Sequence, residues 1–238
     1  MKQVAIVFYG LTRSLKRTYL SIKTNIFDVL SRSGYTYTIY MHTYHIDGSY
    51  TNIRANEHCR NYDNTQHTIL NPHYLLVENQ DDCLKSLNIE SYYTKLGNWT
   101  GMTPEITRYL IQNLVLALYS KKKIMEYLSN TGIQYDYIII MRPDFRILTE
   151  IDISWFSELG TKSIIIPERD WFCGCNDRMC IATPDVALYY GNLYDQLLEY
   201  SKNKSIVSER FCLDMLNKQG LTIIKKPIEY TMVRADNN

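Results

Sequence analysis

The sequence lacks a long hydrophobic run. Its 238 residues contain no stretch of about 18 apolar residues, the length at which a helix becomes a candidate to cross a bilayer. The N-terminal apolar run, Val4 to Tyr9, is too short for a signal peptide and is followed at once by Gly10 and Arg13. We therefore expect no transmembrane segment and a cytoplasmic location.

The sequence also lacks an excess of charge of either sign. Its 26 Lys and Arg residues against 25 Asp and Glu residues give a formal net charge of +1. No global field directs such a chain to nucleic acid or to an anionic membrane, so a nucleic-acid partner is not expected. The 45% of hydrophobic residues is ordinary for a globular protein. The 21 Tyr residues can stack on a base or a sugar, or fill half-buried strand positions.

Several motifs are missing as well. The six cysteines include no C-x₂-C pair, which disfavours a zinc site, and without a secretion signal they should be mostly reduced. The His residues form no metal-ligand motif, although His42 at the end of a predicted strand could approach a site. With no internal repeat and no linker, residues 1–238 are interpreted as a single domain.

The patterns that are present alternate between strands and helices. Short apolar or alternating runs predict strands, and apolar residues at helical spacing predict helices. The predicted strands are Val4 to Tyr9, Tyr35 to Tyr44, Tyr74 to Glu78, Tyr137 to Met141, Ile164 to Ile166, Leu221 to Ile224 and Ile228 to Val233. The predicted helices are Ser14 to Leu30, Asp81 to Leu87 with Asp as its cap, Thr103 to Asn130, Asp185 to Tyr200 and Val207 to Lys218.

This alternation predicts an α/β fold with a mainly parallel central sheet and helices on both faces. The polar, aperiodic segment from Asp47 to His73 is expected to be a long loop or an irregular insertion. Ligands of such sheets bind beyond the carboxyl ends of the strands. That rule selects two places in the chain.

The first place is the turn after the first strand. Tyr9, Gly10, Thr12 and Arg13 lie there, and they could offer a close backbone approach, N–H groups at a helix start and a guanidinium for phosphate. The single glycine does not form the dinucleotide-binding pattern. Arg13 could equally be a solvated residue of the first helical turn.

The second place follows the apolar strand that ends at Met141. Pro143 cannot donate a ladder hydrogen bond, so the strand should end there and present Arg142 and Asp144 at the sheet rim. A carboxylate at that point suits Mg²⁺ or Mn²⁺, which often combine one or two carboxylates with substrate phosphates. The alternative is an Arg–Asp ion pair that closes a turn.

Two more carboxylates are candidates for chemistry. Asp177 follows a loop, Glu168 to Cys175, that contains Trp171 and Phe172 and could cover a sugar. We expect Asp177 to bind sugar hydroxyls or to act as a catalytic base, or else to pair with Arg178. Glu209 is a second candidate base, or a residue that complements a helix dipole.

Arg142-Pro143-Asp144 resembles the acidic D-x-D motif of GT-A glycosyltransferases, with Arg142 where the first Asp is expected. The chain as a whole is similar to small glycosyltransferases of large DNA viruses and some bacteria. The segments that carry this likeness are Tyr9-Gly10 with Arg13, Met41-His42-Thr43-Tyr44, Arg142-Pro143-Asp144, Asn176-Asp177-Arg178, Glu209-Arg210, and Tyr230 with Arg234.

The resemblance implies a GT-A (Rossmann-like) fold and a hexosyl- or pentosyltransferase that moves a sugar from a nucleoside-diphosphate sugar, with UDP as the nucleotide, to a glycan or a protein-linked acceptor. A viral chain would act in the host cytoplasm. It implies Mn²⁺ or Mg²⁺ at Asp144, and a donor site formed by Tyr9, Gly10, Thr12, Arg13, Arg142, Asp144 and Arg234. Asp177 and Glu209 would be catalytic. The alternative functions are a non-catalytic nucleotide- or glycan-binding module of the same fold and a nucleotidyltransferase, although the latter's glycine-rich loop is missing.

Overall fold

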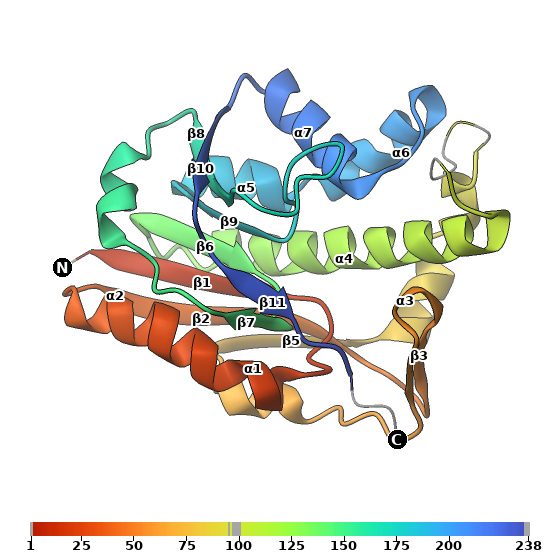
Figure 1. Ribbon diagram of the computed structural model, residues 1–238, viewed down its shortest axis with the longest axis horizontal. Helices are drawn as coiled ribbons and strands as arrows, with labels where there is room; N and C mark the ends of the chain where they lie inside the picture. Colours follow the sequence, from red (N-terminus) through yellow and green to blue (C-terminus); the bar gives the residue numbers. More distant parts are fainter. Residues whose placement is uncertain (1, 95, 97–100, 236–238) are drawn as a thin grey trace.

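The centre of the molecule is a seven-stranded sheet (Figure 1). The computed structural model describes residues 2–94, 96 and 101–235. Across the sheet the strands are β10 (Thr222–Lys226), β8 (Ser163–Pro167), β9 (Met179–Ala182), β6 (Tyr137–Met141), β1 (Gln3–Tyr9), β2 (Thr36–His45) and β5 (Tyr74–Asn79). β9 is antiparallel to β6 and β8, and the other neighbours are parallel. The predicted mainly parallel α/β sheet is confirmed.

The central strands are apolar along their whole length because both faces of the sheet are covered. All five residues of β6 are buried. In β1, Ala5 and Val7 belong to the core on one face, and Val4 and Ile6 belong to the core on the other. Strands covered on both faces are expected to have continuous apolar runs, and this is the pattern that made β1 and β6 readable from the sequence.

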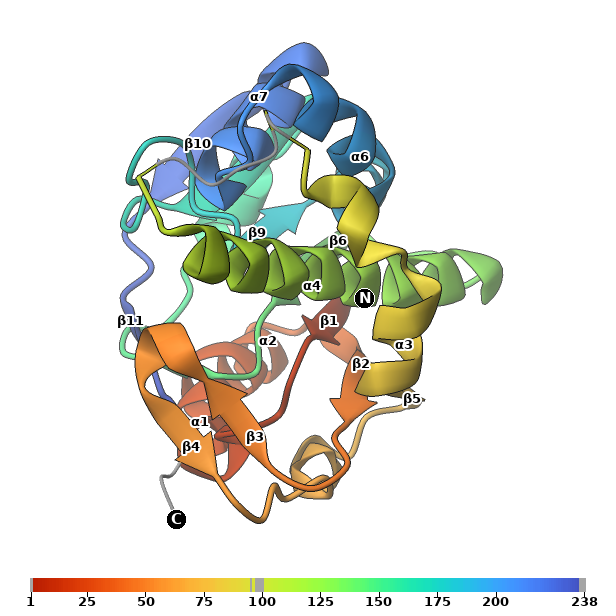
Figure 2. The same ribbon diagram turned by 90° about the vertical axis from the view of Figure 1, so that its right-hand side faces the viewer.

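Helices cover both faces, as predicted (Figures 1 and 2). One face packs against α1 (Leu15–Ile22) and α2 (Asp28–Arg32), which are joined by a π-helical turn within the single helix that was predicted. The other face packs against α4 (Pro104–Asn130), α5 (Pro184–Gly191), α6 (Tyr194–Asn203) and α7 (Ser208–Lys218). Thr103 caps α4 by accepting from the Ile106 amide at 3.3 Å.

Two helix predictions are corrected. The expected helix from Asp185 to Tyr200 is divided into α5 and α6. α5 ends where it meets α4 so closely that a Cβ at Gly191 would lie 2.4 Å from Cγ of Met125. The short helix α3 (Gln80–Ser86) forms as expected, but its cap is Asn79, whose side chain accepts from the amides of Asp81 and Asp82.

Two small antiparallel pairs lie outside the central sheet. The strand expected at the C-terminal end forms as β11 (Tyr230–Met232), but it pairs with β7 (Phe145–Ile147) rather than with the main sheet. The segment after β2 contains the hairpin of β3 (Tyr50–Asn52) and β4 (Glu57–Cys59). Short 3₁₀ helices span Ile53–Ala55, Gln66–Leu70, Ile89–Tyr92 and Ile153–Glu158. Across the described ranges, no helix is both long and apolar enough to span a membrane.

Candidate functional site

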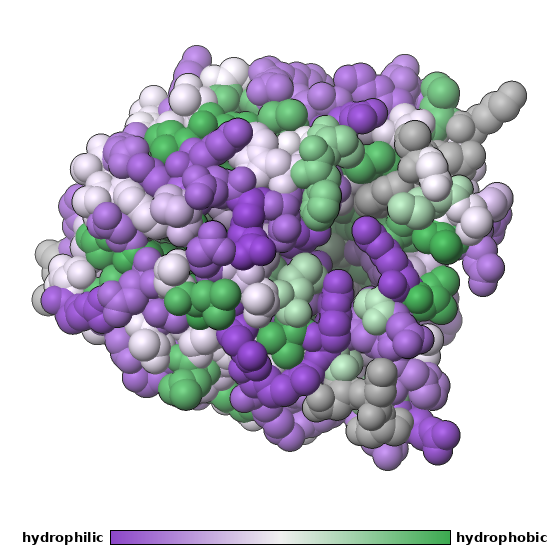
Figure 3. Space-filling model, in the orientation of Figure 1, coloured by the Kyte–Doolittle hydropathy of each residue, from purple (hydrophilic) through white to green (hydrophobic). Residues whose placement is uncertain are grey.

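A pocket of about 580 Å³ lies beyond the carboxyl ends of β1, β2 and β6. Its walls come from the β1–α1 loop, the 3₁₀ turn after β3, one side of α4, the loop after β8, the start of α7, and β11 with the residues that follow it. The space-filling view shows a hollow in this part of the surface with hydrophilic side chains along its border (Figure 3). The pocket therefore lies at the sheet edge where ligands of parallel α/β sheets bind.

The β1–α1 loop contributes Tyr9, Gly10 and Arg13 to the pocket, but not Thr12. Gly10 has a φ of +88°, a conformation that side chains disfavour, and its amide donates to Ser120 Oγ at 2.8 Å. Thr12 is 1% exposed and does not line the pocket. The donor contact expected of Thr12 stays a prediction that its burial disfavours.

Arg13 is a buried ion-pairing residue rather than a solvated one. Its guanidinium contacts Asp144 at 2.7 Å and Glu57 at 3.1 Å, and it donates to the Tyr50 hydroxyl. Burial alone would lower the pKa of Arg13, but the neighbouring carboxylate of Asp144 and the other acidic groups raise it well above its usual value. Arg13 thus links the first strand to the insertion after β2.

Asp144 is enclosed by the two arginines and is only 1% exposed. Its Oδ1 accepts from Arg142 Nε at 2.9 Å, and its Oδ2 accepts from Arg142 Nη2 at 2.6 Å and from Arg13 Nη2 at 2.7 Å. Burial would raise the pKa of Asp144, but Arg142 and Arg13 together hold it well below its usual range. These contacts match the alternative given for the Arg142-Pro143-Asp144 segment, an Arg–Asp ion pair that closes a turn.

The donor set around Asp144 does not fit a divalent cation. Both carboxylate oxygens already accept hydrogen bonds from guanidinium groups, and Asp144 itself does not line the pocket. Within the described ranges no group of three or more His, Cys, Asp or Glu side chains could hold a metal ion. Mg²⁺ and Mn²⁺ prefer oxygen ligands free of such cationic partners. The metal role of Asp144 stays a prediction that this geometry disfavours.

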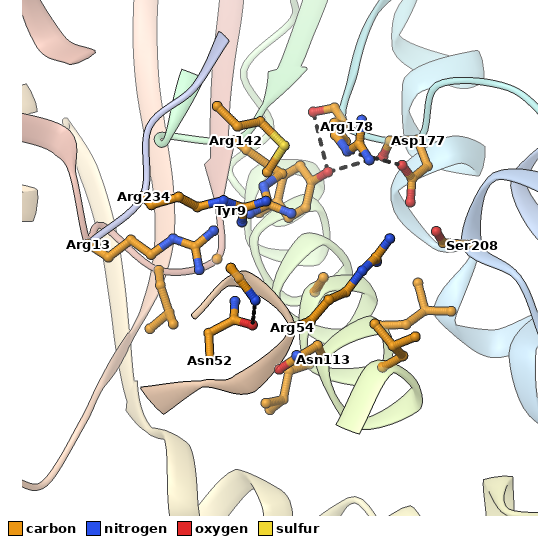
Figure 4. Close-up of a pocket in the computed structure, with 18 of the residues that line it drawn as sticks. Tyr9, Arg13, Asn52, Arg54, Asn113, Arg142, Asp177, Arg178, Ser208 and Arg234 are labelled. Atoms are coloured by element: carbon orange, nitrogen blue, oxygen red, sulfur yellow. Dashed lines mark hydrogen bonds and ion pairs between the residues drawn. The ribbon is translucent and has the colours of Figure 1, made fainter. Parts of the chain in front are cut away.

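Two further arginines lie at the same side of the pocket. Arg234, which was predicted, lines it with a side chain that is 44% exposed and lies 3.9 Å from Glu57. Arg54, which was not predicted, comes from the 3₁₀ turn after β3. In Figure 4, Arg13, Arg142 and Arg234 lie on one side of the pocket, and Arg54 reaches into its interior.

The opposite side of the pocket gathers carboxylates around Arg178. Its guanidinium lies 3.0 Å from Asp170, 3.4 Å from Glu209 and 3.8 Å from Asp177. Both predicted catalytic carboxylates line the pocket, and Asp177 and Arg178 form the pair that was the alternative for Asp177. Three carboxylates against one guanidinium leave this side negative, so it suits hydroxyl groups or a developing positive charge.

Glu209 and Asp177 differ in their surroundings. Burial first, and then the nearby charge of Asp177, raises the pKa of Glu209 above its usual value. Asp177 Oδ1 is buried and accepts no hydrogen bond within the part of the chain that the structure describes. A carboxyl group in a pocket whose pKa is raised by burial and by a neighbouring charge is a candidate for general acid–base chemistry.

Close packing of the loop after β8 brings Asp177 next to α7. The Asn176 amide group is buried, donates to Arg169 O at 3.1 Å and to Tyr230 Oη at 2.5 Å, and accepts from the Arg178 amide. At Gly174 a Cβ would lie 1.9 Å from the Glu209 carbonyl oxygen, so only glycine allows this approach. The Tyr9 hydroxyl also holds this loop by donating a hydrogen bond to the Asp177 carbonyl at 3.2 Å.

Several pocket residues could not be identified from the sequence. Arg54 lies in the aperiodic segment between Asp47 and His73, and so does Glu57, which lies behind the pocket. In such a segment the sequence pattern does not distinguish a pocket residue from a polar residue exposed to solvent. Arg169 and Asp170 follow β8, and the rule that ligands bind after the strands could have found them. His42 does not line the pocket: its ring bonds Ser120 and Glu78 inside the protein.

Comparisons with known proteins give similarity of fold only. No protein-family model matches the chain, and no curated protein matches it. A galactosyltransferase, LgtC, solved with donor and acceptor sugar analogues, is 10% identical with a TM-score of 0.48, over 93% of this chain and 72% of that one. Mouse xyloside xylosyltransferase 1 is 9% identical with a TM-score of 0.44, over 95% of this chain and 85% of that one.

The glycosyltransferase GlyE of Streptococcus pneumoniae TIGR4 is 12% identical with a TM-score of 0.40, over 94% of this chain and 45% of that one. These three structures are named as sugar transferases. Because their TM-scores lie below 0.5, function has to be inferred from the pocket.

Proposed function

We propose that this chain is a glycosyltransferase that moves a hexosyl or pentosyl group from a nucleoside-diphosphate sugar, with UDP as the nucleotide, to a hydroxyl group of a glycan or of a protein-linked acceptor. The observation that carries the proposal is the two-sided charge of the pocket. One side presents guanidinium groups, and the other presents Asp177 and Glu209. A nucleotide sugar has the matching polarity, since its diphosphate is anionic and its sugar carries hydroxyls.

The two sides of the pocket suggest how the substrate lies. The diphosphate faces Arg142 and Arg234, the nucleoside lies over the Tyr9–Gly10 turn, and the sugar extends toward Asp177. In this arrangement the guanidinium groups stabilise the negative charge that grows on the leaving diphosphate as its bond to the anomeric carbon breaks. The acceptor oxygen forms the new bond to that carbon.

The acceptor hydroxyl must also lose a proton. In the proposed mechanism Asp177 or Glu209 takes it when transfer proceeds with inversion. The location of both side chains in the pocket lining, on the side opposite the guanidinium groups, supports this role. The carboxylates around Arg178 also favour the partial positive charge that builds on the sugar ring in the transition state.

A product assay tests this function. The protein is incubated with a panel of UDP-hexoses and UDP-pentoses, with and without simple glycan acceptors, and the released nucleotide is identified. Release of UDP with transfer of the sugar supports the proposal. Release of pyrophosphate would instead identify a nucleotidyltransferase. Binding of nucleotide or glycan without release of any product would identify a non-catalytic module.

A further inference from the structure

The guanidinium side of the pocket carries more positive charge than its own carboxylates neutralise. The three positive charges of Arg13, Arg142 and Arg234 are paired with only two negative charges, those of Asp144 and Glu57. The two carboxylates are 1% and 2% exposed, so they lie behind the arginines and not in the pocket. Burial, and then the nearby charge of Arg13, lowers the pKa of Arg234, as expected where guanidinium groups crowd together.

These arginines keep hydrogen-bond donors without acceptors. Arg13 Nε is buried and has no partner within the described residues. Arg142 uses Nε and Nη2 on Asp144, which leaves Nη1 unused in the described part of the chain. Arg54 lines the pocket and forms no hydrogen bond or ion pair with the described residues. Unpaired donors beside a surplus of positive charge predict an anionic ligand.

Building on the proposed function, we propose that Arg54, Arg142 and Arg234 bind the diphosphate of the donor directly, and that donor binding needs no divalent cation. A cation at Asp144 would have to displace two guanidinium groups from one buried carboxylate, and their mutual repulsion would then be unshielded. Guanidinium groups match phosphate oxygens in charge and in their forked geometry. Asp144 and Glu57 hold the arginines in place and do not contact the donor.

Calorimetric titration of the protein with UDP tests the proposal, once in EDTA and once in excess MnCl₂. The expected result is the same affinity within about a factor of two. Affinity at least tenfold higher with Mn²⁺ would overturn the metal-independent mode and leave the glycosyltransferase proposal standing. Inorganic pyrophosphate, titrated in EDTA, serves as a probe for the anion site without the nucleoside.

The two titrations separate this inference from the proposed function. Pyrophosphate binding without UDP binding would support the arginine site while counting against a nucleotide donor. If neither ligand binds, the inference fails, whereas the product assay still decides the proposed function. UDP binding in EDTA supports both.

Arginine variants test which side chains bind the anion. Arg54→Ala removes no ion pair within the described residues, so the fold should be preserved, and UDP binding should weaken about 10- to 100-fold, the loss expected for a charge-assisted hydrogen bond. Arg54→Lys should recover part of that loss. Arg146→Ala is the matched control, since Arg146 is exposed on β7 outside the pocket. Equal UDP affinity in Arg54→Ala and in the parent protein would overturn the role of Arg54.

Discussion

At the scale of single residues, Asp144 illustrates how one carboxylate can be structural although its motif indicates a ligand site. The sequence places Asp144 after a buried strand, where it does lie, but the pattern does not reveal that Arg13, 131 positions away, contacts the same oxygen as Arg142. The two arginines make Asp144 an anchor of their guanidinium groups, and its metal role stays a prediction that this geometry disfavours. The location of Asp144 at the end of β6 could be predicted from the sequence, but its ion-pair partner Arg13 could not.

Asp144→Asn should therefore destabilise the fold by about 3 kcal/mol, since removing one member of a buried ion pair leaves charges uncompensated. Denaturant unfolding measures this. Asp28→Asn is the control, because its pair with Lys23 is 46% exposed on both sides and should contribute less than about 1 kcal/mol. Equal losses in the two variants would contradict the anchoring role.

The same carboxylate predicts a pH dependence of stability. The pKa of Asp144 is lowered in the folded protein from its ordinary value of 3.8, so its ion pairs contribute fully above about pH 4. That contribution is lost as the pH falls through the lower folded pKa. Unfolding free energies measured from pH 6 downward should fall more steeply below pH 4 in the parent protein than in Asp144→Asn.

Asp177 belongs to the opposite side of the pocket, and its loss should affect turnover rather than donor binding. If Asp177 takes the acceptor proton, Asp177→Asn should retain UDP affinity while transfer slows by about 10²–10⁴-fold. Steady-state kinetics and UDP titration separate the two effects, with Asp195→Asn outside the pocket as a control. An unchanged transfer rate would remove Asp177 from the mechanism and leave Glu209 as the base to test.

Glu209 provides a check on that assignment through pH. Its pKa is raised from 4.5 by burial and by the charge of Asp177, so a reaction that needs ionised Glu209 should gain rate as the pH rises past that raised pKa. Asp177→Asn removes the neighbouring negative charge. In a plot of transfer rate against pH, the rise on the acidic side should therefore move to lower pH in this variant. If the transfer rate rises at the same pH in Asp177→Asn and in the parent protein, the ionisation of Glu209 does not control the rate.

At the scale of elements, the sequence predicts what depends on local pattern. β1, β6 and α4 were readable because their apolar spacing and the Thr103 cap are local signals. The break between α5 and α6 was not, because the apolar periodicity continues through it. The sequence also does not reveal that Gly191, the last residue of α5, packs so closely on α4 that a Cβ there would lie 2.4 Å from Cγ of Met125. The direction of β9 likewise depends on its neighbours, β6 and β8.

The loop that presents Asp177 also depends on a contact between elements. Gly174→Ala should place a methyl group 1.9 Å from the Glu209 carbonyl, which forces the loop away from α7. We expect a loss of about 1–3 kcal/mol of stability together with a loss of transfer, because Asp177 and Glu209 would separate. Gly160→Ala is the control, as its nearest contact would be Ser163 Oγ at 3.9 Å. A thermal unfolding scan and the transfer assay measure both effects, and a fully active variant would contradict this packing argument.

At the scale of the whole molecule, the pocket exists because the sheet brings distant segments to one edge. Residues of the β1–α1 loop, the β3–β4 insertion, the loop after β8, α7 and the C-terminal β11 meet there. The rule that ligands lie beyond parallel strands predicted the β1 and β6 contributions. It could not predict the insertion, since an aperiodic polar segment carries no signal for where it folds back.

The cysteines give a test of the whole packing arrangement. All six are free thiols, five are buried and only Cys173 is exposed. The five buried thiols lie in β4, α3, the loop before Asp177, β9 and α7. Their protection therefore depends on the packing of the β3–β4 hairpin, of α3, of the helices on the α4 face of the sheet and of the pocket loop. An aromatic disulfide reagent should therefore modify one thiol rapidly in the native protein and all six in denaturant. Cys173→Ser should abolish the rapid phase without changing the thermal midpoint. Rapid modification of a second thiol in the native protein would show that one of these elements opens far more readily than its burial implies.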